Sequence, residues 1–264
     1  MTPDQIALAF RTARLGATAL AAYPAPTVPD ALEPAYAIQT LAIGAWPDRV
    51  AGWKVAAVQP QWRERYPAER LSGPVFAKRV VMATAAPLDV PVIVDGYAAV
   101  EAEFALRIAD NFPLNTRFTD TAALLPHVAA VHAAIEMAGS PLANLGALGP
   151  GAVISDFGNN TGLIVGQELT GFHDRSLADW PSAVWLNDTL VGEGSAERIP
   201  GGPLSALLFL VNNLVERGLT LRPGDWVSTG ASAGIHPVKA GDHVRVSFDG
   251  QPAFDLAFVD AMPA

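Results

Sequence analysis

The chain has 264 residues, of which 50% are hydrophobic and 16% charged, so it can bury a substantial core and is not a disordered tail. The formal net charge is -9 and no cluster of Lys and Arg stands out, so we expect neither nucleic acid nor an anionic membrane as a partner. No run reaches the roughly 18 apolar residues of a membrane span, and the first residues lack the pattern of a signal peptide. We therefore expect a cytoplasmic protein, and the lack of cysteine excludes disulfides, thiolate metal sites and a cysteine nucleophile.

Helices are expected at the beginning of the chain. Thr2, Pro3 and Gln5 form a capping box with proline at the first helical position, and apolar residues then recur at helical spacing to about Tyr23. Four prolines in "AYPAPTVPDALEP" end this helix, and "AYAIQTLAIGAW" predicts a second one. We interpret residues 1–48 as an N-terminal helical section.

Short strands dominate residues 49–264, which we expect to form one β-rich domain. The segments "VWLNDTLVGEG" and "HVRVSFDGQPAFDLAFV" predict hairpins, the second turned by Asp249 and Gly250. One late helix is expected from Pro203 to Gly218, with Leu and Val residues on one face that packs against a sheet. Together these elements predict the α+β class.

Two acidic residues stand in an alternating segment, "YAAVEAEFALRI". Successive strand side chains point to opposite faces, so Glu101 and Glu103 share one face and the apolar residues share the other. Two close carboxylates repel each other unless a cation such as Mg²⁺ lies between them. The alternative is an outward strand face wetted by two glutamates.

Two further charged residues lie in apolar surroundings. Glu136 follows "DTAALLPHVAAVHAA", an Ala-rich and helix-like approach, and we expect it to be largely buried, where an unpaired carboxylate is costly. Alternatively, Glu136 forms a salt bridge or lies at the end of a helix. Lys54 in "GWKVAAV" is either an edge residue with its ammonium in solvent or a functional ammonium whose proton affinity falls on partial burial.

Several segments occur together in the order of one family: "GWKVA", "GPVF", "VEAEFAL", "AAIEMAGS", "ISDFGNNTGLIVG", "NDTLVGEG" and "LRPGDWVSTG". In these segments the chain resembles the 2-keto-4-pentenoate hydratases and 4-oxalocrotonate decarboxylases of the fumarylacetoacetate hydrolase superfamily, over nearly its whole length. The resemblance implies a mixed β-roll core with an N-terminal helical section, a homo-oligomer, and a Mg²⁺ or Mn²⁺ cofactor.

The same resemblance implies roles for individual residues. It makes Glu101, Glu103 and Glu136 the metal ligands and Lys54 and Asp156 catalytic. Lys54 would either transfer a proton or hold a substrate carboxylate. Four polar residues are implied to bind substrate: Asn159, Asn160, Thr229 and Ser232.

Two features depart from the family pattern. Asn159 and Asn160 stand where serines are usual, and Ala77, Lys78 and Arg79 follow "GPVF" where many members carry an acid. If that acid places water in the hydratases, then Glu64, Glu69 or Lys78 would have to replace it.

Three arginines lie in "QPQWRERYPAERLSG", a segment with the composition of a lid over a site. Arg63, Arg65 and Arg70 could grip a distal carboxylate of a diacid substrate, or they could form a solvated mixed-charge surface.

The function implied is a metal-dependent lyase that adds water to a small 2-hydroxydienoic or 2-oxoenoic acid in aromatic-compound catabolism. Decarboxylation of a 2-oxo diacid and C–C hydrolysis of an acylpyruvate are alternatives with the same enolate chemistry. A non-catalytic partner subunit is a further alternative, although such a protein has no physical need for three convergent carboxylates.

Overall fold

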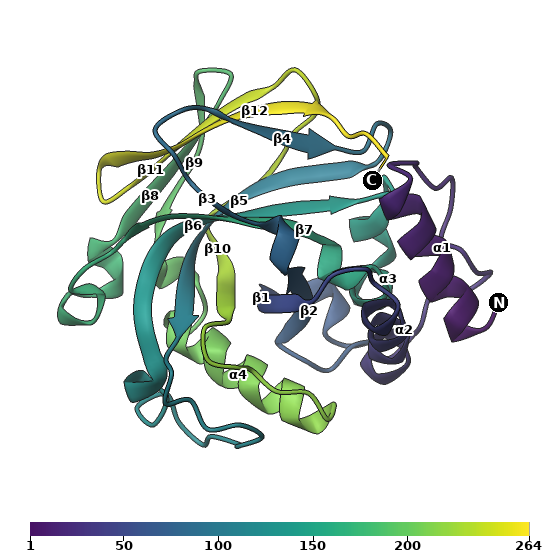
Figure 1. Cartoon of the computed structure of the whole chain (residues 1–264), viewed down its shortest axis with the longest axis horizontal. Coiled ribbons are helices and arrows are strands. Elements are labelled where there is room, and N and C mark those ends of the chain that lie inside the picture. The colour runs from purple at the N-terminus through teal and green to yellow at the C-terminus, as the bar shows by residue number, and fades with distance from the viewer. Residues whose placement is uncertain (264) are drawn as a thin grey trace.

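Two β-sheets pack face to face in the computed structural model, which describes residues 1–263 (Figure 1). Within these residues the larger sheet has seven strands in the order β2-β1-β10-β5-β6-β7-β3. Their bounds are β1 Val50–Ala57, β2 Arg70–Phe76, β3 Val80–Met82, β5 Tyr97–Ile108, β6 Val128–Ser140, β7 Asn160–Glu168 and β10 Trp226–Pro237. The smaller sheet, ordered β4-β12-β11-β8-β9, contains β4 Leu88–Val92, β8 Pro181–Leu186, β9 Thr189–Ser195, β11 His243–Phe248 and β12 Gln251–Asp260.

Both sheets are mixed. Strand β1 runs parallel to β10 and β3 parallel to β7, whereas the other pairs of the larger sheet are antiparallel. Figure 1 shows β5, β6 and β10 curling strongly, with the smaller sheet across one side and the first helices at one end. This arrangement confirms the predicted α+β fold with N-terminal helices and a curled mixed sheet. The predicted hairpins are also present as β8–β9 and β11–β12.

The two faces of the larger sheet have different roles. Val100, Ala102 and Phe104 point from β5 into the main hydrophobic core, which is shared with the smaller sheet and with the helix α4, Gly202–Glu216. Phe104 packs edge-on against Phe248 of β11. The intervening positions of β5 point to the opposite face, so Glu101 is directed away from this core, as the alternation predicts.

Helices α1 (Pro3–Leu15) and α2 (Leu32–Gly44) form the helical section, and the predicted capping box at Thr2 is present. Helix α1 is shorter than expected and ends at Leu15, because Ala17 has a positive φ of 48° that no helix continues through. No helix among residues 1–263 combines the length and the apolar character that crossing a membrane requires.

The approach to Glu136 differs from the prediction. The second half of the Ala-rich stretch before it, residues 128–134, is not helical but begins β6, which lies between β5 and β7, and the first half contains one short 3-10 turn at Leu125–His127. Strand β6 is paired with β5 along one edge and with β7 along the other. This tertiary packing outweighs the helical propensity of alanine.

Candidate metal centre

Three buried glutamates meet on the face of the larger sheet opposite the main core. Glu101 and Glu103 lie on β5, and Glu136 is the direct cross-strand partner of Glu101 on β6. One carboxylate oxygen from each of the three lies within 4.8 Å of the other two. Their residues are 4%, 0% and 0% exposed, which excludes the alternative of an outward, solvated strand face. Like charges directly opposite each other on neighbouring strands are destabilising, so this cluster requires compensation.

The protonation of these acids reflects the crowding. Burial, followed by the charge of Glu136, raises the pKa of Glu101 from its ordinary 4.5 to about 8. The same two causes, joined by Glu101, raise the pKa of Glu103 well above its ordinary value. Without a bound cation the cluster therefore holds protons at neutral pH.

Lys54 supplies the positive charge that the protein itself places beside the acids. Its Nζ atom lies 3.2 Å from Oε1 of Glu136 and donates to Oδ1 of Asn159 at 3.1 Å. Burial alone would lower the pKa of Lys54, but the charges of Glu136, Glu101 and Glu103 outweigh it and raise the pKa. The predicted fall in the proton affinity of Lys54 therefore does not follow from the surrounding side chains.

The oxygen atoms of the cluster fit a hard divalent cation. Oε1 of Glu103 and Oε2 of Glu136 are buried and have no hydrogen-bond partner among the described residues. The other oxygen of Glu103 accepts from Oγ of Ser228 at 2.5 Å and from the backbone N–H of Gly230 at 2.8 Å. Oε1 of Glu136 accepts from Asn160 at 3.1 Å. The carboxylates are thus held in place with free oxygens left over, and carboxylate oxygen is the donor that Mg²⁺ and Mn²⁺ prefer.

A cavity of about 620 Å³ opens beside the acids. It brings together residues from β1, β2, β5 and β10 with the segment after the short helix α3, Pro150–Ser155. Five of the predicted site residues line it: Lys54, Arg70, Glu101, Asn159 and Thr229. Trp62, Tyr97 and Arg198 are among the other lining residues, which the sequence did not assign to the site. Burial and the charge of Glu101 raise the pKa of Tyr97 to about 12.

Other predicted residues lie outside this cavity. Arg63 and Arg65 are exposed; Arg63 donates to the carbonyl of Val58, and Arg65 stacks over Tyr66. Ser232 is buried, donates to the carbonyl of Ala102 and pairs with another serine, so its hydroxyl is not available to a ligand in the cavity. The proposed substitutes for the missing acid, Glu64, Glu69 and Lys78, are also exposed and do not line the cavity.

Asp156 is fully buried outside the cavity and is paired with an arginine of helix α1. Nε of Arg14 donates to Oδ1 of Asp156 at 2.5 Å, and the guanidinium also donates to the carbonyls of Gly139, Asp156 and Asn160. This contact, which we call the Arg14–Asp156 clamp, holds the segment that carries Asn159 and Asn160. Phe157, Gly158 and Asn159 all have positive φ angles of 55° to 64°, which is unfavourable for two of them and needs such support.

The sequence indicates some of the residues that were not predicted, Ser228, Tyr97 and Arg14, more clearly than others. Ser228 could have been found, because strand alternation places it with Gly230 on the face opposite to Thr229. Tyr97 could also have been found, since it is on the same face of β5 as Glu101. Arg14 carries no local signal, because its contacts are more than 120 residues away in the chain.

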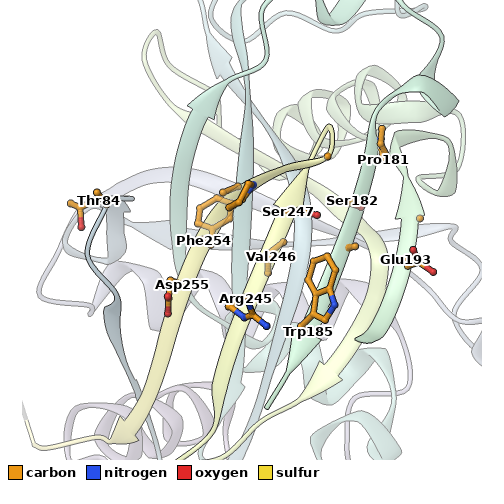
Figure 2. Close-up of a pocket in the computed structure, with 16 residues that line it drawn as sticks. Thr84, Pro181, Ser182, Trp185, Glu193, Arg245, Val246, Ser247, Phe254 and Asp255 are labelled. Atoms are coloured by element: carbon orange, nitrogen blue, oxygen red, sulfur yellow. The ribbon is translucent and has the colours of Figure 1, made fainter. Parts of the chain in front are cut away.

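A larger cavity, of about 830 Å³, lies on the smaller sheet (Figure 2). Trp185, Arg245 and Asp255 project into it from neighbouring strands, and Glu193 stands at one side. It contains none of the predicted site residues, and the clustered acids do not reach it. Its size therefore does not make it the centre of the chemistry.

Known proteins are similar in sequence to part of this chain. A 4-oxalocrotonate decarboxylase of Pseudomonas sp. (strain CF600) is 27% identical over 108 residues, and 2-keto-4-pentenoate hydratase 1 of Dechloromonas aromatica (strain RCB) is 30% identical over 97 residues. The chain is a distant homologue of these enzymes. The two alignments cover 41% and 37% of both partners, so less than half the length of these relatives is matched, and no family model matches the chain.

Solved structures match over a larger part of the chain. A 4-oxalocrotonate decarboxylase from Pseudomonas putida G7, complexed with magnesium and adipate, superposes with a TM-score of 0.79 over 97% of both chains at 19% identity. Fumarylpyruvate hydrolase from Pseudomonas aeruginosa, in complex with Mn²⁺ and pyruvate, gives a TM-score of 0.57 over 81% of this chain and 91% of the other, at 16% identity. These likenesses establish the fold of the fumarylacetoacetate hydrolase superfamily, as the sequence motifs predicted. Relatives with this fold hold Mg²⁺ or Mn²⁺, and the three glutamates of this chain could hold the same ions.

Divalent metal binding should release protons, because the pKa of Glu101 in the metal-free protein is about 8 and must be overcome by the cation. The folded-state pKa of Glu101 lies above its ordinary value of 4.5, so protonated Glu101 stabilises the metal-free protein fully below pH 4.5. This stabilisation is lost as the pH rises through about 8. We therefore expect Mn²⁺ affinity to rise between pH 6 and 8, by up to about tenfold per pH unit for each proton released. Titration calorimetry in two buffers of different ionisation enthalpy measures the proton release. Glu101→Gln should bind more weakly; an affinity that is the same at pH 6 and 8 would contradict the cluster.

Arg14→Met should destabilise the protein by about 3 to 5 kcal/mol, because it leaves the carboxylate of Asp156 buried and unpaired. Urea denaturation measures this loss. The double variant Arg14→Met/Asp156→Leu removes both charges and should lose less than the two single variants added together. As a control, Arg117→Met breaks an exposed pair with Glu216 and should cost about 1 kcal/mol or less. Additive losses at Arg14 and Asp156 would show that the clamp contributes no coupling.

Proposed function

We propose that the chain is a metal-dependent lyase that adds water to a small 2-hydroxydienoic or 2-oxoenoic acid. The observation that supports this most is the convergence of three buried glutamates beside Lys54, with Lys54 and Glu101 lining one cavity. Three carboxylates on one divalent ion leave about three octahedral positions, enough for a 2-oxo acid to chelate and for a water. A non-catalytic relative would have no use for this arrangement.

The chemistry can be divided among the groups present. A divalent ion held by Glu101, Glu103 and Glu136 would supply positive charge to the carboxylate and 2-oxygen of the substrate. Lys54, whose pKa is raised by the neighbouring carboxylates, lines the same cavity, so it can give a proton to the substrate carbon and take one back. Asn159 fixes the direction of that ammonium, and Asn160 fixes the Glu136 carboxylate.

The cationic residues of the cavity indicate a second carboxylate on the substrate. Arg70 and Arg198 both line the cavity, whereas Arg63 and Arg65 do not. Arg70 is the better placed of the two for a strong interaction, because it is only 7% exposed and a charge pair there is less screened by water. Arg70 lies 3.9 Å from the exposed carboxylate of Glu69 and donates to the carbonyl of Pro200, and Arg198 donates to the carbonyl of Glu193. A five-carbon monoacid whose carboxylate is held by the metal offers these arginines no further carboxylate. We therefore favour a 2-oxoenedioic acid as the substrate, with its distal carboxylate near Arg70.

Decarboxylation of a 2-oxo diacid is the second candidate. It is favoured by the absence, among the described cavity residues, of any carboxylate besides Glu101 that could activate water. It is also the reaction named for two of the homologous enzymes. Against it, an arginine that pairs with the departing carboxylate stabilises the ground state more than the transition state, in which that charge is lost. Hydration keeps the distal carboxylate and is not opposed in this way.

A panel of substrates separates these functions. Purified protein would be assayed with 2-hydroxypenta-2,4-dienoate, 2-oxohept-3-enedioate, 4-oxalocrotonate and acylpyruvates, each with Mg²⁺ and with EDTA. Hydration of the enoates only in the presence of Mg²⁺ supports the proposal. Release of CO₂ from 4-oxalocrotonate without hydration would assign the second candidate, and metal-independent turnover would refute the role of the glutamates.

Lys54→Met should lower kcat by about 10²-fold or more with Mg²⁺ at saturation, the range expected for a proton-transfer group. Methionine keeps most of the apolar stem and removes the ammonium. Steady-state kinetics give the effect, and the melting temperature and Mn²⁺ affinity of the same variant report on folding and on the acid cluster. An unchanged kcat with a lower melting temperature would limit Lys54 to charge compensation in the fold.

Arg70→Ala should weaken kcat/KM for the diacid by about 30-fold or more relative to the monoacid, since loss of one partner of a desolvated ion pair typically costs about 2 to 5 kcal/mol. The measurement is the ratio of kcat/KM for 2-oxohept-3-enedioate to that for 2-hydroxypenta-2,4-dienoate. Arg65→Ala is the matched control, because Arg65 belongs to the same segment but is exposed. An equal ratio in all three proteins would favour the short monoacid as substrate.

A further inference from the structure

One tyrosine differs from the other three in the bonding of its hydroxyl. The hydroxyl of Tyr23 donates to Oγ of Ser155 at 3.1 Å, and that of Tyr66 donates to the carbonyl of Pro29 at 2.6 Å. The hydroxyl of Tyr36 accepts from the backbone N–H of Ser72 at 3.0 Å. Tyr97 is the exception, because its hydroxyl has no side-chain or backbone partner in residues 1–263.

The position of Tyr97 makes this unbonded hydroxyl informative. Tyr97 begins β5 and is separated from Glu101 by four positions, so both side chains leave the same face of the strand. It is half-buried and lines the same cavity as Lys54 and Asn159. Its pKa of about 12, raised first by burial and then by the charge of Glu101, keeps it a neutral phenol over the whole working range of an enzyme.

A neutral phenol has the properties needed to hold a reacting water. It can donate one hydrogen bond and accept others, whereas Arg70 and Arg198 in the same cavity only donate. The hydroxyl of Thr229 also lines the cavity but already donates to the carbonyl of Phe104 at 2.6 Å. Tyr97 is therefore the hydroxyl of the described cavity whose bonding capacity is unused.

We propose that Tyr97 holds the water that is added to the substrate. This assigns to Tyr97 the role for which Glu64, Glu69 or Lys78 was considered, none of which lines the cavity. The inference rests on the proposed hydration. A lone pair of this water forms a bond to C4 of a 2-oxo-3-enoate, and the C3=C4 electron pair moves toward the 2-oxygen. Lys54 gives a proton to C3 and takes up the proton that the added water releases. The product is substrate plus one water, and Tyr97 keeps its own proton throughout.

Tyr97→Phe tests this role because it removes only the hydroxyl. We expect hydration kcat to fall by about 10²-fold or more, in the range of a group that assists proton transfer and orientation. A second reaction of the same site needs no added water: exchange of the C3 protons of 2-oxopentanoate for deuterium, followed by NMR in D₂O with Mg²⁺. We expect exchange by Tyr97→Phe to stay within about threefold of wild type, and Mn²⁺ affinity to be unchanged.

The controls separate this inference from the proposed function. Tyr36→Phe removes a hydroxyl bonded outside the cavity and should leave both hydration and exchange near wild type. If Tyr97→Phe keeps full hydration, or loses hydration and exchange equally, Tyr97 does not hold the water. Wild-type protein that exchanges C3 protons but hydrates nothing also overturns the role of Tyr97, while leaving the metal centre in place. Wild-type protein with neither reaction overturns both.

Discussion

The feature on which the rest of the site depends is the enforced proximity of buried like charges. The register of β5 against β6 places Glu101 directly opposite Glu136, and strand alternation adds Glu103 on the same face. When all three are ionised, Lys54 compensates only one of the three charges. The remaining two negative charges must be neutralised by protons or by a divalent cation. Protons stabilise the metal-free state of the protein, and the cation stabilises the metal-bound state. The fold therefore couples proton uptake and metal binding at one point, because its hydrogen-bonded strands cannot move the acids apart.

The helical section contributes to this point although it lies far away in the sequence. Asn159 and Asn160 direct the charges of Lys54 and Glu136, and both asparagines belong to a turn with successive positive φ angles. Such a turn costs free energy that contacts among its own residues do not offset. Arg14 of helix α1 offsets this cost with three hydrogen bonds to Asp156 and Asn160, on the two sides of the turn, and donates a fourth to Gly139 of β6. Asp156, for which the resemblance implied a catalytic role, is in this structure the ion-pair partner of that arginine.

The sequence predicted those parts of the site that depend on local periodicity. The shared face of Glu101 and Glu103 follows from the two-residue repeat of a strand, which needs no knowledge of the fold. The order of the family motifs along the chain then indicated that Glu136 and Lys54 belong to the site. The alanines before Glu136, however, were interpreted as helix-like, whereas those from Ala129 onward lie in a strand. The Arg14 contact could not be predicted, because it joins segments whose packing is decided by the whole molecule. Local composition also could not show that Arg70 lines the cavity whereas Arg63 and Arg65 do not.

The distribution of charge in the cavity also implies an order of binding. Of the three acids Glu101 lines the cavity, and so do Arg70 and Arg198. For the diacid substrate proposed above, the arginines attract the carboxylates, whereas the acid cluster offers no positive charge until a divalent cation replaces its protons. We therefore expect the cation to bind before the 2-oxo acid end of the substrate, with Arg70 near the other end.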